Sequence, residues 1–142
     1  MEQYKENFYF ITDKEVILEH IVDVKNLLSQ SYWAKERKVE VIERSIKNSI
    51  CFAILDDSSN KIIAFARVVT DYATMYYLAD VIVDEKYRGN GIGKALLKRI
   101  IVDDSELQKL FGLLLTADAH TLYSQFGFRE NNEKCMCKFK NS

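Results

Sequence analysis

The sequence predicts a mixed α/β fold in which a mostly antiparallel central sheet of six or seven strands is flanked by about four helices. Three β-rich runs follow one another at 50–56, 61–69 and 75–84, which favours antiparallel neighbours. The strand–helix–strand crossover at 74–116 should be right-handed and leave its two strands parallel. Because 142 residues suffice to bury one hydrophobic core, we expect a single domain, 1–142.

The first half of the chain supplies one strand and two helices before the main sheet. Residues 8–12, FYFIT, have the composition of a strand. A helix is expected at about 19–29, where Val24 and Leu28 belong to an apolar stripe with helical spacing. The same spacing returns at 39–50 and predicts a second helix.

Two charged residues interrupt the most apolar strands. The runs 61–69 and 75–84 are otherwise nearly continuous in apolar residues, which is typical of central strands covered on both faces. An ion pair between Arg67 and Asp80 across the hairpin would account for both charges. Alternatively, a carboxylate in an apolar strand would have a raised pKa, which suits proton abstraction. Both interpretations stay open at this point.

The second half of the chain alternates helices and strands. Helical spacing extends over 91–102 and places apolar residues on one side. The following pattern predicts a buried strand at 112–116, a short helix at 118–126 and a final strand at 134–140.

Composition and charge exclude several classes of partner. The formal net charge is −1, and the cluster of Lys35, Arg37 and Lys38 is too short to form a nucleic-acid-binding stripe. No apolar run approaches the roughly 18–20 residues that cross a bilayer, and the opening residues lack the pattern of a secretion signal. We expect a soluble cytoplasmic protein, monomeric or homodimeric, with no nucleic-acid or membrane partner.

The three cysteines are expected to be reduced thiols. Cys51, Cys135 and Cys137 form an odd number, in a chain with the features of an intracellular protein. No second pair of ligands is spaced to join Cys135 and Cys137, so no metal site is expected.

The stretch YRGNGIGKALL, at 87–97, places three glycines at the start of a helix. Unpaired N–H groups at a helix start and close backbone approach at glycine together favour binding of an anion, typically a phosphate. A Walker A loop is excluded, because Gly89 and Gly93 flank three residues and Ala95 follows Lys94. The dinucleotide fingerprint fits poorly, because it requires a glycine at position 94 and a parallel βαβ opening.

The segment VDEKYRGNGIGKALL resembles the pyrophosphate loop of the GCN5-related N-acetyltransferases (GNAT), whose core is Arg/Gln-x-x-Gly-x-Gly/Ala. Arg88, Gly91 and Gly93 match that core. A second segment, AHTLYSQFGF, resembles the family's A-x-x-L-Y-x-x-x-G-F element, with all of its defined positions in place: Ala119, Leu122, Tyr123, Gly127 and Phe128.

The resemblance implies the GNAT fold and acetyl-CoA as co-substrate, bound in a cleft where the strands at 76–83 and 112–116 splay apart. The pantetheine would pair with the strand edge at Val81 and Val83, and an N–H near Ile82 would polarise the thioester oxygen. The pyrophosphate would be held by the backbone N–H groups and nearby charges of Arg88, Gly89, Asn90, Gly91, Ile92, Gly93 and Lys94.

The resemblance also implies catalytic roles. Tyr123, four residues before Gly127, occupies the family's general-acid position and would contact the cofactor sulfur. Asp80 is the candidate base, with His120 or a chain of ordered waters as alternatives. The chain departs from the family at Thr116, where many members carry asparagine, and at Ala79, where many carry glutamate.

The acceptor is expected to be a primary amine, most simply on a small molecule. Asp80, Trp33 and Tyr72 are the candidate binding residues, because carboxylates and aromatic rings both recognise ammonium groups. Further aromatic candidates are Tyr32, Tyr76 and Tyr77. The alternatives are a non-catalytic module that binds acyl-CoA and a different nucleotide at the glycine loop.

Overall fold

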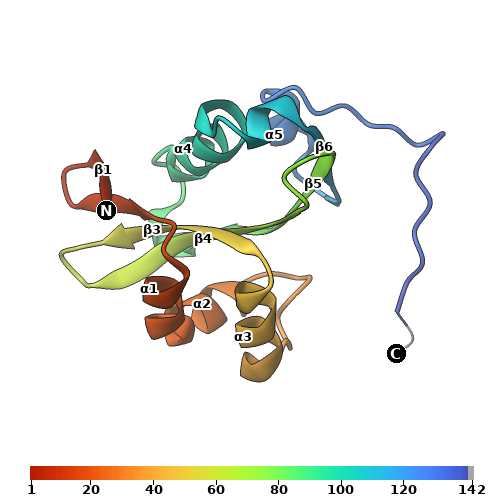
Figure 1. Cartoon of the computed structure of the whole chain (residues 1–142). Helices are drawn as coiled ribbons and strands as arrows, with labels where there is room; N and C mark the ends of the chain where they lie inside the picture. Colours follow the sequence, from red (N-terminus) through yellow and green to blue (C-terminus); the bar gives the residue numbers. More distant parts are fainter. Residues whose placement is uncertain (141–142) are drawn as a thin grey trace.

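The computed structural model describes residues 1–140 as a six-stranded sheet between two layers of helices (Figure 1). The strands are β1 (Glu2–Lys5), β2 (Phe8–Ile11), β3 (Ile50–Asp56), β4 (Lys61–Thr70), β5 (Met75–Val83) and β6 (Phe111–Leu114). The α-helices are α1 (Lys14–Glu19), α2 (Ile21–Leu28), α3 (Val39–Lys47), α4 (Ile92–Lys98) and α5 (His120–Ser124).

The strands follow one another across the sheet in chain order. Each pair from β1 to β5 is antiparallel, and β5 and β6 are parallel. The parallel pair results from the crossover through α4, as expected from the sequence. The short strand β1 was not expected, because Glu2–Lys5 is polar and its strand structure comes from pairing with β2.

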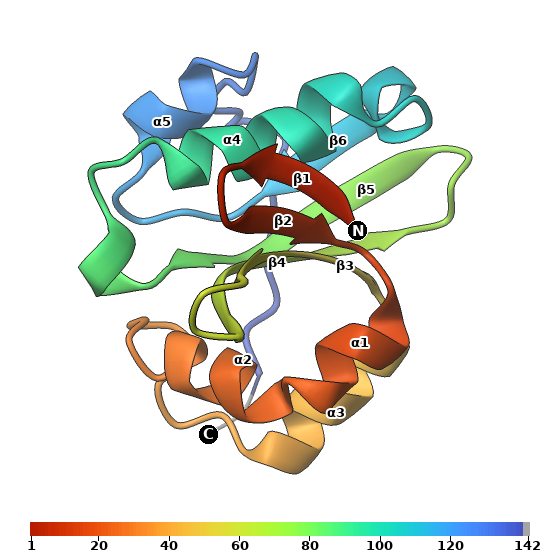
Figure 2. The same ribbon diagram turned by 90° about the vertical axis from the view of Figure 1, so that its left-hand side faces the viewer.

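The two helical layers cover opposite faces of the sheet (Figure 2). The first three helices pack on one face around buried residues such as Ile17, Leu27 and Ile46, with Phe65 from the sheet. On the other face, α4 packs Leu96 and other apolar side chains against the sheet. The sheet therefore separates two apolar cores, which explains the nearly continuous apolar run in β4.

The helix expected at 19–29 is divided in two. Asp13 begins α1, since its Oδ1 accepts a hydrogen bond from the Glu15 backbone N–H (2.9 Å). The chain leaves helical geometry at His20, whose Nδ1 lies 3.1 Å from Asp23 Oδ2, and α2 begins at the next residue. The helix expected at 91–102 is α4, continued by a π-helical turn at Arg99–Asp103.

The prediction of a strand at 134–140 is wrong. These residues leave the body of the molecule as an irregular segment (Figure 1), in which Met136 and Phe139 are 97% and 83% exposed. In an alternating pattern Met136 would share its face with Lys138 and other lysines, so only one face of such a strand would be apolar. That pattern gives too little burial to fix a strand, and β6 is left as the edge of the sheet.

Within residues 1–140, no helix is long and apolar enough to cross a membrane.

Candidate functional site

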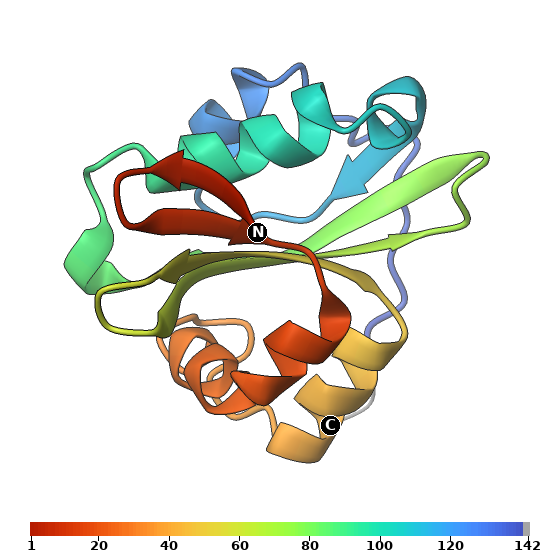
Figure 3. The ribbon, with the colours of Figure 1, turned by 60° about the vertical axis from the view of Figure 1, so that its left-hand side comes forward.

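Strands β5 and β6 part at one edge of the sheet, about midway along β5. Their pairing ends at Leu78 and Leu114, yet β5 continues to Val83 with no strand of residues 1–140 on that side (Figure 3). The splay expected from the sequence is therefore present. Backbone groups of β5 beyond Leu78 face the opening, as strand addition by an extended ligand requires.

The glycine loop lies at the end of β5 and leads into α4. Gly89 and Gly91 have φ angles of +84° and +77°, and glycine adopts this left-handed conformation without strain. Asn90 Nδ2 donates to the Tyr87 carbonyl (3.0 Å), and Arg88 Nε donates to the Val83 carbonyl (3.1 Å). These two bonds hold the loop, and no side chain caps the first N–H groups of α4 among the described residues.

Gly93 differs from the other two glycines of the loop. Its backbone conformation is open to any residue, and an added Cβ would meet only Val83 Cγ2, at an ordinary contact distance of 3.5 Å. The fold therefore does not require glycine at this position. A surface that stays free of side chains at the first turn of a helix suits the close approach of a phosphate group.

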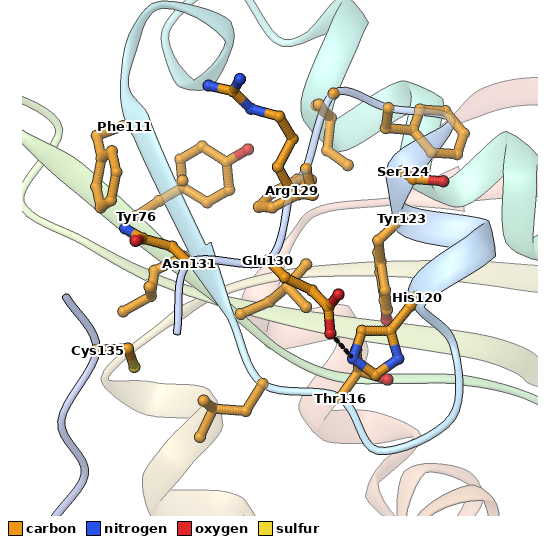
Figure 4. Close-up of a pocket in the computed structure, with 18 of the residues that line it drawn as sticks. Tyr76, Phe111, Thr116, His120, Tyr123, Ser124, Arg129, Glu130, Asn131 and Cys135 are labelled. Atoms are coloured by element: carbon orange, nitrogen blue, oxygen red, sulfur yellow. Dashed lines mark ion pairs between the residues drawn. The ribbon is translucent and has the colours of Figure 1, made fainter. Parts of the chain in front are cut away.

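Tyr123 projects from α5 beside a hollow of about 1140 Å³ between β6, α5 and residues 129–135 (Figure 4). Its ring packs against Phe128, with 6.2 Å between centroids. Burial, with smaller contributions from Tyr32 and Asp118, raises the pKa of Tyr123 to about 12. The hydroxyl therefore keeps its proton at neutral pH and has no hydrogen-bond partner within residues 1–140.

His120 and Thr116 line the same hollow but are already engaged. His120 Nε2 lies 3.5 Å from Glu130 Oε1 at the surface (Figure 4). Thr116 Oγ1 accepts a hydrogen bond from the Ala119 backbone N–H (3.0 Å), just before α5 begins. Thr116 thus helps to start the helix that carries Tyr123, which the sequence pattern did not indicate.

Asp80 is the centre of a buried polar cluster. Its Oδ1 accepts from Trp33 Nε1 (3.1 Å), and its Oδ2 accepts from Arg37 Nη1 (2.7 Å) and Arg67 Nε (2.9 Å). The backbone of Asp80 has φ +55°, at an irregularity in the pairing of β4 with β5. Aspartate tolerates this left-handed conformation better than most residues.

The expectation of a raised pKa at Asp80 is wrong. Burial acts to raise the pKa, but hydrogen bonds and charge from Arg67, and then from Arg37, outweigh it and hold the pKa below its usual range. The ion pair with Arg67 was one of the two interpretations and is present. Arg37 was missed as a partner, although the positive charge of 35–38 was visible in the sequence.

The loop between α2 and α3 brings aromatic residues to the splay. Trp33 contacts Asp80, and its ring meets that of Tyr32 edge to face, with centroids 5.0 Å apart. The Tyr32 hydroxyl accepts from the Ala117 backbone N–H (3.1 Å), which connects this loop to the segment between β6 and α5.

Other aromatic candidates lie elsewhere. Tyr72 occupies the β4–β5 turn, at the opposite end of β5 from Asp80, so the structure does not bring it to Trp33. Tyr76 is buried and packs over Gly112, where an added Cβ would lie 2.6 Å from the ring. Burial raises the pKa of Tyr77, which lies close enough to Arg67 for the guanidinium to oppose that shift.

The cysteines and the acidic groups are not gathered into a metal site in the part of the chain that the structure describes. Cys51 is buried, and burial raises the pKa of its thiol to about 12. Cys135 and Cys137 are exposed thiols in the irregular segment.

Comparison with known proteins finds acetyltransferases in each case. The family model "Acetyltransferase (GNAT) domain" matches residues 47–130. A soybean protein named histone acetyltransferase TAP1 is 29% identical over 126 residues, covering 80% of this chain and 53% of that protein. An Arabidopsis thaliana protein, "GCN5-related N-acetyltransferase 2, chloroplastic", is also 29% identical and covered over 51% of its length. The chain thus spans about half the length of these curated relatives.

A solved structure matches over nearly the whole of both chains. A Xanthomonas campestris protein described as an acetyltransferase of the GNAT family superimposes with a TM-score of 0.85 and 34% identity, covering 96% of each chain. The family match includes both the glycine loop and the α5 segment with Tyr123. On these grounds the chain belongs to the GCN5-related N-acetyltransferase (GNAT) family.

Proposed function

We propose that this protein transfers the acetyl group of acetyl-CoA to a primary amine of a small-molecule acceptor, by direct attack within a ternary complex. The observation that carries the proposal is the parting of β5 and β6 beside the glycine loop. An elongated donor with a pyrophosphate at one end fits this combination of an open strand edge and an open helix start. Three free cysteines support a cytoplasmic location.

The residues present fit acetyl-CoA as the donor. Backbone N–H groups of residues 88–94 would hold the pyrophosphate, and the absence of a Cβ at Gly93 leaves room for it. Arg88 and Lys94 are exposed nearby and add positive charge. The β5 edge at Val81 and Val83 would pair with the pantetheine amides, and an N–H near Ile82 would bind the thioester oxygen.

Tyr123 is proposed as the proton donor to the departing sulfur. When the amine nitrogen bonds to the carbonyl carbon and the carbon–sulfur bond breaks, the thiolate gains a proton and the amine loses one. A hydroxyl whose pKa is raised to about 12 keeps its proton throughout the physiological range, and it gives that proton to a thiolate of pKa about 8.5 only where the departing sulfur is held against it. Its half-buried position limits competition from water.

Asp80 is proposed to position other groups rather than to remove the amine proton. Its carboxylate already accepts three hydrogen bonds, and its lowered pKa makes it a weak base. We propose that the amine proton leaves through water at the opening between β5 and β6.

A thiol-release assay with a panel of amines tests the proposed function. Wild-type protein should release free CoA from acetyl-CoA only when an accepted amine is present, and mass spectrometry should find the acetylated amine. Tight binding of acetyl-CoA without release of CoA by any amine would instead favour a non-catalytic acyl-CoA-binding module. Calorimetry with ATP and NAD as competing ligands checks that the glycine loop prefers the acetyl-CoA donor.

A further inference from the structure

The cluster around Asp80 contains more positive than negative charge. Arg37 and Arg67 both pair with the single carboxylate of Asp80, and neither has another acidic partner within 4.0 Å in residues 1–140. One carboxylate between two guanidinium groups leaves a net charge of +1. Partly buried charges are normally paired, so this excess indicates that a further anion belongs in the cluster.

The two guanidinium groups also retain unused hydrogen-bond donors. Arg67 donates through Nε to Asp80 and through Nη1 to Ser49 Oγ (3.2 Å), which leaves its Nη2 without a partner among residues 1–140. Arg37 uses only Nη1, so its Nε and Nη2 are unused within the same residues. The side chains are 23% (Arg37) and 16% (Arg67) exposed, so a small ligand can reach them.

The position of Arg37 is fixed by its own loop. Lys25 Nζ donates to the Arg37 carbonyl (2.5 Å), and Ser31 Oγ accepts from the Ala34 backbone N–H (3.0 Å) within the same turn. Burial of Ala34 and Ser31 anchors the loop on the helical layer beneath the sheet. The guanidinium is therefore held in place before any ligand arrives, which lowers the entropic cost of binding.

The cluster lies beside the proposed reaction centre. Asp80 is two residues beyond Leu78, where pairing of β5 with β6 ends. Trp33 contacts Asp80 on one side and Tyr32 on the other. Tyr32 in turn is near enough to Tyr123 to contribute to its raised pKa. The proposed acid and the two arginines thus both have the Tyr32–Trp33 pair in their neighbourhood.

We propose that the amine acceptor also carries an anionic oxygen group, a carboxylate or a phosphate, which Arg37 and Arg67 bind. This inference rests on the proposed function, because it assigns the substrate class of the same site. Guanidinium groups match such oxyanions through paired, charge-assisted hydrogen bonds. The acceptor is accordingly an amino acid or an amino phosphate rather than a simple amine or a polyamine.

Binding can be tested independently of catalysis, because Trp33 is the only tryptophan of the chain and touches the cluster. The fluorescence of Trp33 should change in titrations with phosphoethanolamine or 4-aminobutyrate. The counterparts that lack the anionic group, ethanolamine and 4-aminobutanamide, should bind roughly tenfold more weakly or worse, as expected for loss of hydrogen bonds to charged groups. The two anionic probes also tell whether phosphate or carboxylate is preferred.

Arg37→Gln should weaken binding of the two probes that carry an anionic group by about tenfold and leave binding of the two amines without that group unaffected. Arg37→Lys keeps the charge and should restore part of the affinity. Arg44→Gln is the matched control, because Arg44 is exposed on α3 and has no ion pair within the described residues. Unchanged circular dichroism and acetyl-CoA affinity in Arg37→Gln would exclude misfolding as the cause.

The outcomes separate this inference from the proposed function. Equal binding of the probes with and without an anionic group, or equal responses of wild type and Arg37→Gln, would overturn the anionic acceptor even if amines are acetylated. Selective anion binding that depends on Arg37 would support it. If CoA release never occurs despite such binding, the proposed function fails while the anion site stands.

Discussion

Among single residues, Gly93 distinguishes the needs of the fold from those of a ligand. Gly93→Ala should leave the free energy of unfolding unchanged or raise it by about 0.5–1 kcal/mol, because alanine favours helix and the added Cβ meets no obstacle. The same change should weaken acetyl-CoA binding by about tenfold, or ~1.4 kcal/mol, by blocking approach to the backbone. Urea unfolding and calorimetry measure the two effects.

The control for this variant is Gly91→Ala, since Gly91 has φ +77°. That change should cost about 1–2 kcal/mol of stability through backbone strain. Wild-type donor affinity in a stable Gly93→Ala protein would contradict pyrophosphate binding at this loop.

Tyr123→Phe should lower kcat by roughly 10²-fold and leave the dissociation constant of acetyl-CoA within about twofold, because only the proton donor is lost. Since the pKa of Tyr123 is raised to about 12, its protonated form dominates below that pH. The wild-type rate should therefore not decline between pH 8 and pH 10 through loss of this proton. Steady-state rates across this range check both statements.

The matched control is Tyr4→Phe, on β1 at the opposite edge of the sheet from β6. It should leave kcat unchanged. A Tyr123→Phe enzyme with wild-type turnover would remove Tyr123 as the acid.

Asp80→Asn should destabilise the protein by about 3 kcal/mol at pH 7, because two guanidinium groups lose the one buried counter-charge that they have within residues 1–140. A carboxyl with a lowered pKa in the folded state stabilises above its unfolded pKa of about 3.9 and loses that contribution as pH falls toward the folded value. The difference in the free energy of unfolding between wild type and Asp80→Asn should thus shrink below about pH 4. Urea unfolding at pH 7, 5 and 3.5 measures it.

Asp103→Asn provides the comparison, since Asp103 forms an exposed ion pair with Lys98. Exposed pairs contribute little, so this variant should lose less than about 1 kcal/mol. A pH-independent defect in Asp80→Asn would contradict the ionised state assigned to Asp80.

At the scale of elements, the short strand β6 depends on a close fit with β5. Gly112→Ala would place a Cβ 2.6 Å from Tyr76 Cζ and from its hydroxyl oxygen. Because Tyr76 is buried, the ring cannot move without disturbing its neighbours, and the variant should lose about 1–3 kcal/mol. In the Gly112→Ala variant, amide hydrogen exchange should become faster in β5 and β6 than in wild type and stay unchanged in β2 and β3. Unchanged protection of β5 and β6 in the variant would argue against this packing.

The elements that the sequence predicted correctly are those whose pattern is set locally. The runs that form β3, β4 and β5 are apolar enough to require burial in any compact arrangement. The break at His20, where the side chain contacts Asp23, leaves the helical spacing of apolar residues intact, so periodicity alone does not reveal it. The segment 134–140 has strand composition, but a strand also needs a partner edge and a buried face.

Across the whole molecule, one part of the candidate site consists of continuous sequence motifs that the sequence predicts, and the other part consists of contacts between distant residues that it does not predict. The glycine loop and the Tyr123 segment are continuous motifs, so the sequence contains all of their information. The contacts of Asp80 with Trp33 and Arg37 join residues more than 40 positions apart. No local pattern pairs an irregular loop with a particular strand, which is why Arg37 was missed.

The separation of the two helical layers determines how the two substrates would reach each other (Figure 3). The glycine loop enters α4 on one side of the sheet, whereas Trp33 and Arg37 belong to the loop between α2 and α3 on the other. If the donor and acceptor bind as proposed, they reach the opening between β5 and β6 from opposite faces of the sheet. On this proposal neither substrate blocks the approach of the other, so we expect that either one binds first. The Kd of acetyl-CoA should be the same with and without the amine, and initial-rate plots should show random addition of the two substrates. Binding of acetyl-CoA only after the amine would contradict separate routes to the opening between β5 and β6.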